Sequence, residues 1–242
     1  MEQNNNTGQG IYAPNAGWTF GADTPKNFDS HVERSIPYYH EGHELVAQVS
    51  DFFIKPDSIA YEIGSSTGAL TLHLAKRHAS TVKWIGIEEE SGMVEQANKK
   101  LNENLEKNKN VCFLTENICF SLLEKSDFIV SFYTLQFIAP RFRQEVLNKI
   151  YQALNWGGGF ILFEKVRGPD ARFQDIFSSL YTEFKLKQGF KSEEIIAKSR
   201  SLKGILEPFS TQGNQDLLKR AGFSDISTIF KFLCFEGFLC IK

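Results

Sequence analysis

Short apolar runs of strand length alternate with helical patterns in the first half of the chain, and this alternation leaves few possible folds. An apolar run at 58–64 is followed by a predicted helix over residues 67–77. The next apolar run, at 83–89, is followed by a predicted helix over residues 91–105 and then by a run at 111–117. This order predicts a βαβαβ arrangement.

The same alternation continues toward residue 165. A run at 127–133 leads to a predicted helix over residues 140–154, which stops at the sequence NWGGG, and the strand FILFEK follows at 160–165. Continuous apolar strands between amphipathic helices indicate a parallel sheet that is covered on both faces.

The spacing changes after residue 165. Two further helical patterns are predicted within an insertion at about 166–210, which we interpret as a lid or a partner surface. A helix at 214–222 then leads to strands at 225–233 and 235–242, and so short a connection requires an antiparallel pair. The predicted fold is a Rossmann-like, doubly wound α/β fold with a mostly parallel seven-stranded sheet, an antiparallel C-terminal strand and a helical insertion.

Composition narrows the class of protein. The 242 residues are 42% hydrophobic and 23% charged, and no apolar run approaches the roughly 18 residues that span a bilayer. The polar start MEQNNNTGQG has no signal-peptide pattern, so we expect a disordered tail over residues 1–17, one domain over residues 18–242, and a cytoplasmic location without membrane contact.

The net charge and the cysteine and histidine spacing argue against nucleic-acid binding and against a metal site. The net charge of -2, with both signs spread along the chain, does not predict broad binding to nucleic acid. The four cysteines lack C-x-x-C spacing, which favours packed free thiols, and the five histidines form no ligand-spaced cluster. We therefore expect no metal.

A glycine turn follows the first predicted strand with the pattern Glu62-x-Gly64-x-x-x-Gly68. Gly64 allows a ligand to approach the backbone, and Gly68 permits close packing of the helix. A dinucleotide site would have a glycine where Ser66 stands. A carboxylate at Glu62 would repel a phosphate, so the turn favours a cationic ligand such as S-adenosylmethionine (SAM).

Polar residues at the next two strand ends complete the predicted cofactor site. Glu88 lies about 24 residues after Gly64, close to the spacing at which an acidic residue accepts hydrogen bonds from ribose hydroxyls. Glu89 is the alternative if the strand end shifts by one residue. The amide of Asn117, just after the third strand, is suited to an adenine edge.

The loop SFYTLQFIAP follows the fourth strand and is apolar and aromatic. Tyr133 and Gln136 are predicted to line a substrate pocket beside the sulfonium, because aromatic faces attract cations, whereas Phe137 is expected to pack on the next helix. No strong general base is evident, and His43, Tyr133 and Glu164 are weak candidates.

Several stretches resemble the bacterial carboxy-S-adenosylmethionine (carboxy-SAM) synthases, namely GWTF, ERSIPYY, YTLQFIAP, NKIYQALNWGGGFILFEK and LLKRAGF. The resemblance covers residues 18–242. It implies a SAM-binding fold and an enzyme that makes carboxy-SAM from SAM and prephenate, for carboxymethylation of a wobble uridine in tRNA. By position, it implies cofactor contacts from Tyr39, Gly64, Ser65, Ser66, Glu88, Glu89, Asn117 and Ile118.

Three positions depart from that family's pattern. Ser65 replaces a cysteine, and Phe132 replaces an asparagine that would contact the cofactor. Ser199 replaces the arginine that would bind the extra carboxylate, with Arg200 one residue further on. One residue on a helix is a rotation of about 100°, so Arg200 would substitute only if the helix turned or slipped. A serine does not replace a bidentate arginine.

These patterns predict a SAM-dependent methyltransferase related to the carboxy-SAM synthases, with an acceptor that the sequence does not name. A carboxy-SAM synthase that uses Arg200 is the alternative, and a SAM-binding protein without catalysis is a third. Tyr133 and Arg200 are the predicted catalytic residues. The apolar residues of the insertion also predict a homodimer, and they are Phe173, Ile176, Phe177, Leu180, Tyr181 and Phe184.

Overall fold

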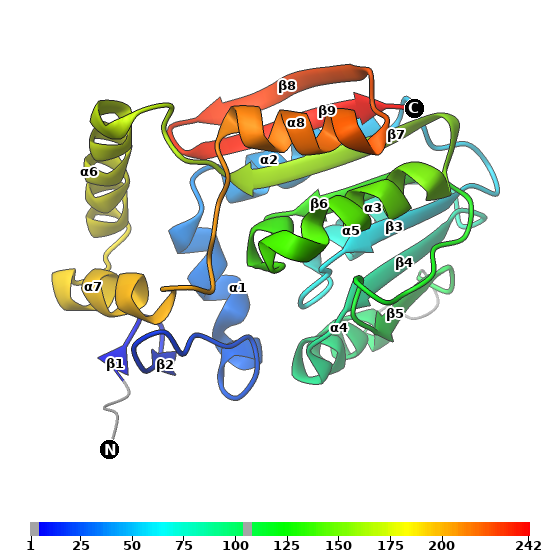
Figure 1. Cartoon of the computed structure of the whole chain (residues 1–242). Helices are drawn as coiled ribbons and strands as arrows, with labels where there is room; N and C mark the ends of the chain where they lie inside the picture. The colour runs from blue at the N-terminus through cyan, green and yellow to red at the C-terminus, as the bar shows by residue number, and fades with distance from the viewer. Residues whose placement is uncertain (1–4, 104–107) are drawn as a thin grey trace.

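A computed structural model describes residues 5–103 and 108–242 of the chain. Its centre is a seven-stranded sheet (Figure 1). In the order in which they lie side by side, the strands are β5 (Val111–Thr115), β4 (Lys83–Glu88), β3 (Ile59–Ile63), β6 (Ser126–Phe132), β7 (Leu154–Lys165), β9 (Phe235–Ile241) and β8 (Asp225–Phe232).

The sheet is parallel from β5 to β7, and β9 pairs antiparallel with both of its neighbours. The chain builds outward from β3 to β4 and β5, and then returns to place β6 on the other side of β3. This reversal is a topological switch point, where doubly wound sheets bind ligands at the carboxyl ends of the strands. The predicted fold class and the predicted antiparallel strand are confirmed.

Two hydrophobic clusters cover the two faces of the sheet. Register partners Ala60, Trp84 and Phe128 belong to one cluster, and the residues that follow each of them belong to the other, because side chains alternate along a strand. Helices α2 (Tyr39–Ser50), α3 (Ala69–Arg77) and α4 (Ser91–Asn102) supply the first cluster. Helices α5 (Pro140–Ala153) and α8 (Thr211–Ala221) supply the second.

Several element boundaries differ from the prediction. Helix α3 begins two residues later than expected because Gly68 has a left-handed φ of +75°. The predicted end of the second helix, at residue 105, lies outside the described residues. Strand β7 starts at Leu154 and runs through the NWGGG segment, with a register shift opposite residues 126–128 of β6. The glycines therefore form an irregular start to the strand and not a loop.

The expectation of a disordered tail is wrong for residues 5–17, and residues 1–4 of that tail lie outside the described part of the chain. Strands β1 (Asn5–Asn6) and β2 (Tyr12–Ala13) pair antiparallel. Ile11, Ala13 and Trp18 form a small buried cluster against residues 202 and 205. Three apolar side chains with a partner surface outweigh the polar composition of the segment.

The insertion at 166–210 contains α6 (Ala171–Lys187) and α7 (Ser192–Ser201). In Figure 1 both helices stand at the left, beyond the carboxyl edge of the sheet, with the β1–β2 pair directly beneath α7. Trp18 N–H donates to Ser201 O at 3.1 Å, and Ala16 N–H donates to Arg200 O at 3.0 Å. The N-terminal segment and α7 therefore form one layer beside the sheet, together with α1 (Thr24–Ser35).

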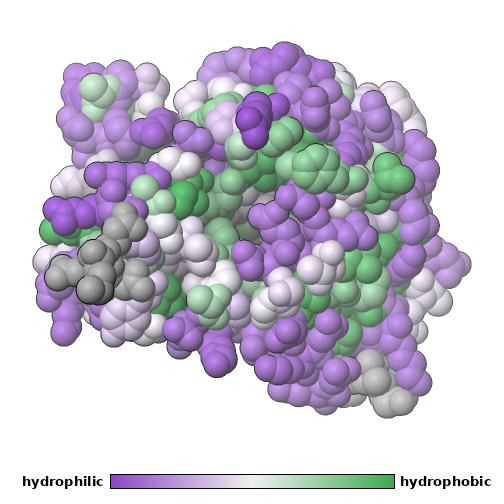
Figure 2. All heavy atoms as spheres, turned by 60° about the horizontal axis from the view of Figure 1, so that its bottom comes forward, coloured by the Kyte–Doolittle hydropathy of each residue, from purple (hydrophilic) through white to green (hydrophobic). Residues whose placement is uncertain are grey.

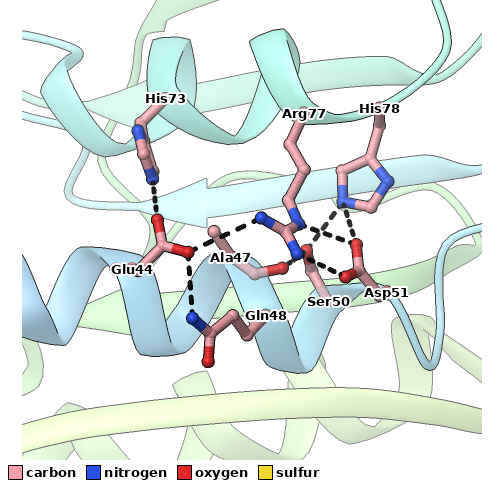
Figure 3. Close-up of polar contacts among 8 residues, drawn as sticks. All are labelled: Glu44, Ala47, Gln48, Ser50, Asp51, His73, Arg77 and His78. Atoms are coloured by element: carbon pink, nitrogen blue, oxygen red, sulfur yellow. Dashed lines mark hydrogen bonds and ion pairs between the residues drawn. The ribbon is translucent and has the colours of Figure 1, made fainter.

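Ion pairs fix α2 against α3 (Figure 3). The Arg77 guanidinium donates to both carboxylate oxygens of Asp51, at 2.8 and 2.6 Å, and lies 3.6 Å from Glu44. Glu44 also accepts from Gln48, and its other oxygen lies 3.3 Å from His73. These contacts hold α2 in place, so that its first turn faces the carboxyl edge of the sheet. Within residues 5–103 and 108–242, no helix combines the length and apolar character needed to cross a membrane.

Candidate active site

A cavity of about 830 Å³ opens at the carboxyl edge of the sheet. Its lining comes from the β3–α3 turn, the ends of β4, β5, β6 and β7, the helices α1, α2, α6 and α7, and Thr7, Trp18 and Phe20 of the N-terminal segment. Figure 2 shows the molecule from obliquely below, with hydrophobic residues set in a hollow behind a mostly hydrophilic rim. The cavity lies at the topological switch point between β3 and its neighbours.

The glycine turn presents its backbone to this cavity. Gly64 has a φ of +74°, and a Cβ atom there would lie 2.2 Å from the Thr134 side chain. Ser66 also has a positive φ, of +47°. The N–H groups of Gly64 and Ser65 donate to Ile87 O at 2.8 and 3.0 Å, which ties the turn to β4. Gly64, Ser65 and Ser66 line the cavity. Gly68 does not, and its tight contacts are with Phe113 and Ala97 in the core.

Glu88 connects the end of β4 to the turn. Its Oε2 accepts from Ser66 N at 2.9 Å and its Oε1 accepts from Glu90 N at 3.0 Å. Burial raises the pKa of this carboxyl group, and the backbone donors oppose the shift. The side chain lines the cavity and each oxygen retains acceptor capacity, as the predicted ribose contact requires.

Glu62 is a fully buried carboxyl group that lines the same cavity. Its Oε2 accepts a hydrogen bond from the Thr71 hydroxyl. Desolvation by burial raises its pKa to about 8. A cation placed beside Glu62 would favour the ionised form, so the site is suited to a positively charged ligand and not to a phosphate.

Glu89 and Asn117 are joined to each other at the rim. Asn117 Nδ2 donates to Glu89 Oε2 at 2.6 Å, and Asn117 Oδ1 accepts from Cys119 N at 2.8 Å. Both side chains are exposed and line the cavity, as does the buried Ile118. Glu88, and not Glu89, is therefore the acidic residue that is directed toward the turn. The adenine contact of Asn117 stays a prediction.

Aromatic rings form the wall opposite the turn. The Phe132 ring lies 5.9 Å from Tyr39 and 4.8 Å from His43, between ring centroids. Burial lowers the pKa of His43 to about 3, and the neighbouring His73 and His40 add to the shift. His43 is therefore neutral at pH 7 and a weak base. Phe132 gives this wall an apolar surface where an asparagine would have offered hydrogen bonds.

Tyr133 reaches the cavity from a strained position. Its φ is +60°, and its N–H donates to Phe163 O at 2.8 Å. Burial raises the pKa of the Tyr133 hydroxyl, and the charge of Glu164 raises it further. Gln136 also lines the cavity, but its side chain donates to Tyr133 O and accepts from Lys165 N. Gln136 therefore braces the loop.

Phe137 and Glu164 lie where packing dominates. The Phe137 ring meets Phe20 edge to face at 4.8 Å between centroids and borders the cavity, and its packing on the next helix stays a prediction. Glu164 is buried and is not among the residues that line the cavity, and burial raises its pKa. The structure thus removes Glu164 as a base candidate.

The end of α7 brings Ser199 and Arg200 to the cavity together. Both side chains are exposed. Within the described residues, no hydrogen bond or ion pair joins the Arg200 guanidinium to another group. The helix does not have to slip for Arg200 to reach the cavity wall.

Sequence reasoning missed a group of lysines at the far end of the cavity. Lys165 ends β7, Lys185 lies on α6 and Lys198 lies on α7, and all three line the cavity beside Trp18 and His31. Residues 20 and 13 apart on different elements carry no spacing pattern, so the sequence offered no signal for this group. The residues that the structure describes contain no cluster of three or more His, Cys, Asp or Glu side chains placed to hold a metal ion.

Comparison with known proteins identifies the family. Residues 60–158 match the family model described as a methyltransferase domain. A carboxy-S-adenosyl-L-methionine synthase of Staphylococcus epidermidis is 35% identical over 93% of this chain and 97% of its own length. One from Desulfotalea psychrophila is 33% identical over 95% of this chain and 94% of its own length. The chain belongs to the carboxy-SAM synthase family.

Solved structures agree with this fold. A protein from Methanococcus maripaludis that is described as a putative SAM-dependent methyltransferase aligns with a TM-score of 0.62 at 19% identity, over 93% of this chain and 94% of that one. Human N-acetylserotonin methyltransferase in complex with SAM aligns with a TM-score of 0.61 at 16% identity, over 90% of this chain and 56% of that one. These similarities show the fold alone.

Family membership makes the protein a SAM-dependent transferase, with SAM as its cofactor or substrate. The residues present fit that group. Two carboxyl groups, those of Glu62 and Glu88, face the turn, where Gly64 leaves no room for a side chain. The first turn of α3 contains no lysine that could bind a phosphate. When bound, SAM supplies an activated methyl carbon on a sulfonium.

Proposed function

We propose that the β3–α3 turn and Glu88 hold the ribose side of SAM, while Glu62 faces the cationic end of the molecule. The hydrogen bonds from Ser66 and Glu90 fix the Glu88 carboxylate before the cofactor arrives, so little reorganisation is needed on binding. Tyr39, Phe132 and Tyr133 provide a dry aromatic wall for the sulfonium, which aromatic faces attract. Ser65, Glu89, Asn117 and Ile118 complete the proposed contacts.

The product that these observations favour is carboxy-SAM, made from SAM and prephenate as the resemblance implies. The observation that carries this choice is Arg200, whose guanidinium borders the cavity without an acidic partner among the described residues. A free guanidinium can bind a carboxylate through two parallel hydrogen bonds. Arg200 would thus take the role of the arginine that Ser199 replaces.

The proposed reaction makes simple demands on the site. The methyl carbon of SAM loses one proton and gains the ring carboxyl group of prephenate, so one C–H bond and the bond between the ring and that carboxyl group break while one carbon–carbon bond forms. The ring becomes aromatic by expelling its hydroxyl group as hydroxide, and the hydroxide takes the methyl proton to give water and phenylpyruvate. With His43 neutral and the pKa of Tyr133 raised, the site offers no strong base. The contribution of the protein would then be to exclude water and to align the donor with the methyl carbon.

The test is mass spectrometry of small molecules after incubation of the purified protein with SAM and prephenate. Carboxy-SAM is expected from the unaltered protein. Arg200→Ala should abolish the product, whereas Lys203→Ala, which removes a nearby exposed cation that does not line the cavity, should leave it intact. Product formation by Arg200→Ala at the unaltered rate would refute the assigned role.

Methyl transfer is the second candidate, and two positions favour it. Phe132 makes the wall beside the cofactor apolar, and Ser199 adds no positive charge. If SAM is converted to S-adenosylhomocysteine in the presence of an acceptor, and prephenate yields no carboxy-SAM, this reading replaces the first.

We also propose a homodimer that is formed in part by α6. None of its 17 residues is buried. Phe173, Ile176 and Leu180, spaced to share one face of the helix, are 40%, 46% and 41% exposed. A second copy of the chain would cover this face. Light scattering at micromolar concentration should give twice the chain mass of 27.5 kDa, and the mass of a single chain would contradict the proposal.

A further inference from the structure

Three lysine side chains border the far end of the cavity without an acidic partner. Lys165, Lys185 and Lys198 are each half-buried. No carboxylate of the described residues forms an ion pair or a hydrogen bond with any of their ammonium groups. Burial is the largest cause of the lowered pKa of all three ammonium groups. Lysines shielded from water are seldom found without a partner, so this group calls for a ligand.

Aromatic rings are the groups that contact these ammonium ions. Lys165 Nζ and Lys185 Nζ lie over the same Tyr181 ring, at 4.5 and 4.6 Å from its centroid, and Lys198 Nζ lies over the Trp18 ring. A ring face offers no hydrogen-bond acceptor strong enough for the three donors of an ammonium group. The rings therefore position the lysines and leave most of their donors available.

Burial and mutual repulsion raise the energy of the cations. Burial, followed by the charge of Lys165, lowers the pKa of Lys185 to about 8. Burial and then Lys185 lower the pKa of Lys198 well below its ordinary value. The nearby His31, which also lines the cavity, has a pKa of about 2 because of burial and of the charges of Lys198, Lys185 and Arg34. An anion bound among the lysines would relieve this repulsion.

The acidic residues that line the cavity do not serve as that anion. Glu62, Glu88, Glu89 and Glu116 lie at the glycine turn and at the ends of β4 and β5. Glu194 lies nearer to the lysines, but its Oε1 accepts from Asn6 Nδ2 and its Oε2 accepts from Lys191 N. The cavity is therefore acidic at the cofactor end and basic at the α6–α7 end.

We propose that Lys165, Lys185 and Lys198 form a carboxylate-binding subsite that holds a small dicarboxylate co-substrate next to the SAM-bearing turn. This inference rests on the proposed function, because it assumes that a second substrate enters the same cavity. Arg200 and the lysines would contact separate carboxylates. Tyr181, whose hydroxyl donates to Ser35 O at 2.9 Å, holds two of the lysines in position and is a positioning residue.

The experiment measures binding without chemistry. Isothermal titration calorimetry is performed on the full chain saturated with S-adenosylhomocysteine, with prephenate and malonate as dicarboxylate probes. Lys185→Met and Lys198→Met are each expected to weaken probe binding about 10-fold or more, since one charge-assisted hydrogen bond is lost. Lys187→Met, on the exposed end of α6 and outside the cavity lining, is the matched control and should bind as the unaltered protein does.

Two further arms separate the possible sources of the carboxylate and keep the proposal independent of turnover. Carboxy-SAM alone is titrated into the same variants, and it should lose less affinity than prephenate does. The double variant Lys185→Arg and Lys198→Arg should recover most of the probe affinity, because it restores the charge.

The outcomes are distinct from those of the proposed function. Weakened binding of either probe in the lysine variants supports the subsite, even if carboxy-SAM is never formed. The subsite is overturned if neither probe binds the unaltered protein, if the lysine variants bind the probes as Lys187→Met does, or if the variants lose as much affinity for carboxy-SAM as for prephenate.

Discussion

Replacing Glu88 with glutamine removes the negative charge at the end of β4 while keeping the size of the side chain. In the structure, each carboxylate oxygen already accepts one backbone N–H, from Ser66 and from Glu90. In Glu88→Gln, the amide nitrogen would face one of these donors. The variant therefore loses both a charged acceptor for ribose and part of the bracing of the turn.

The magnitude follows from the number of bonds. One acceptor site per oxygen remains for the cofactor. A hydrogen bond to a charged group is worth about 1.5 to 3 kcal/mol, and glutamine keeps one neutral acceptor, so the variant should lose about 2 to 4 kcal/mol of binding free energy. The dissociation constant for SAM should then rise about 30- to 900-fold, at 1.36 kcal/mol for each factor of ten.

Isothermal titration calorimetry with SAM measures this change directly. Glu89→Gln is the matched control, because Glu89 is exposed and its carboxylate is bonded to Asn117 at the rim. It should change the SAM affinity by no more than about threefold. Unchanged SAM binding in Glu88→Gln, with an unaltered unfolding midpoint, would refute the assignment of Glu88 to the cofactor.

Three further predictions test other parts of the account. The pKa of Glu62 is about 8 in the free protein, so below that pH its carboxyl group must release a proton when a cation binds beside it. SAM affinity measured by calorimetry should therefore increase with pH up to about 8 and then level off. Glu62→Gln should remove this pH dependence. Gly68→Ala should lower the free energy of unfolding, measured in urea, by about 1 to 3 kcal/mol, because the new Cβ atom would lie 2.5 Å from Phe113 at a φ of +75°. Gly157→Ala is the control: its φ is +80° and no atom lies within 4 Å of the new Cβ, so it should cost only the backbone strain of about 1 kcal/mol. Ser199→Arg should strengthen binding of carboxy-SAM relative to SAM by about 1.5 to 3 kcal/mol, and an unchanged ratio of the two dissociation constants would show that residue 199 does not reach the carboxylate.

The sequence predicted the parts of the site that depend on neighbours along the chain. Glu62, Gly64 and Ser66 belong to one strand-turn-helix unit, and Glu88 follows at a spacing that the βαβ geometry fixes. For the same reason the parallel sheet and its antiparallel last strand could be predicted from the apolar runs, the helical patterns between them and the short last connection.

Features that depend on distant contacts were missed. The lysine group joins the end of β7 to two helices of the insertion, and only the packing of α6 and α7 beyond the sheet brings Lys165, Lys185 and Lys198 together. The ordered structure of residues 5–17 depends in the same way on α7 and the residues after it. Trp18 N–H donates to Ser201 O, and the Ile11, Ala13 and Trp18 cluster packs with Leu202 and Ile205. Patterns of neighbouring residues in the sequence do not predict contacts between segments that lie far apart along the chain.

Some predictions from single residues changed when their surroundings were known. Gln136 lines the cavity, as predicted, but its side chain braces the Tyr133 loop, whereas Glu164, a weak base candidate, lies outside the cavity lining. Arg200, whose helical phase argued against it, does border the cavity, because the cavity wall extends to the last turn of α7.

Mass spectrometry of a reaction that contains the purified protein, SAM and prephenate tests the central claim most directly. We predict that carboxy-SAM appears and that SAM is consumed in equal amount. If SAM stays unchanged, or if S-adenosylhomocysteine is the sole product that accumulates, the proposal that this chain is a carboxy-SAM synthase is contradicted.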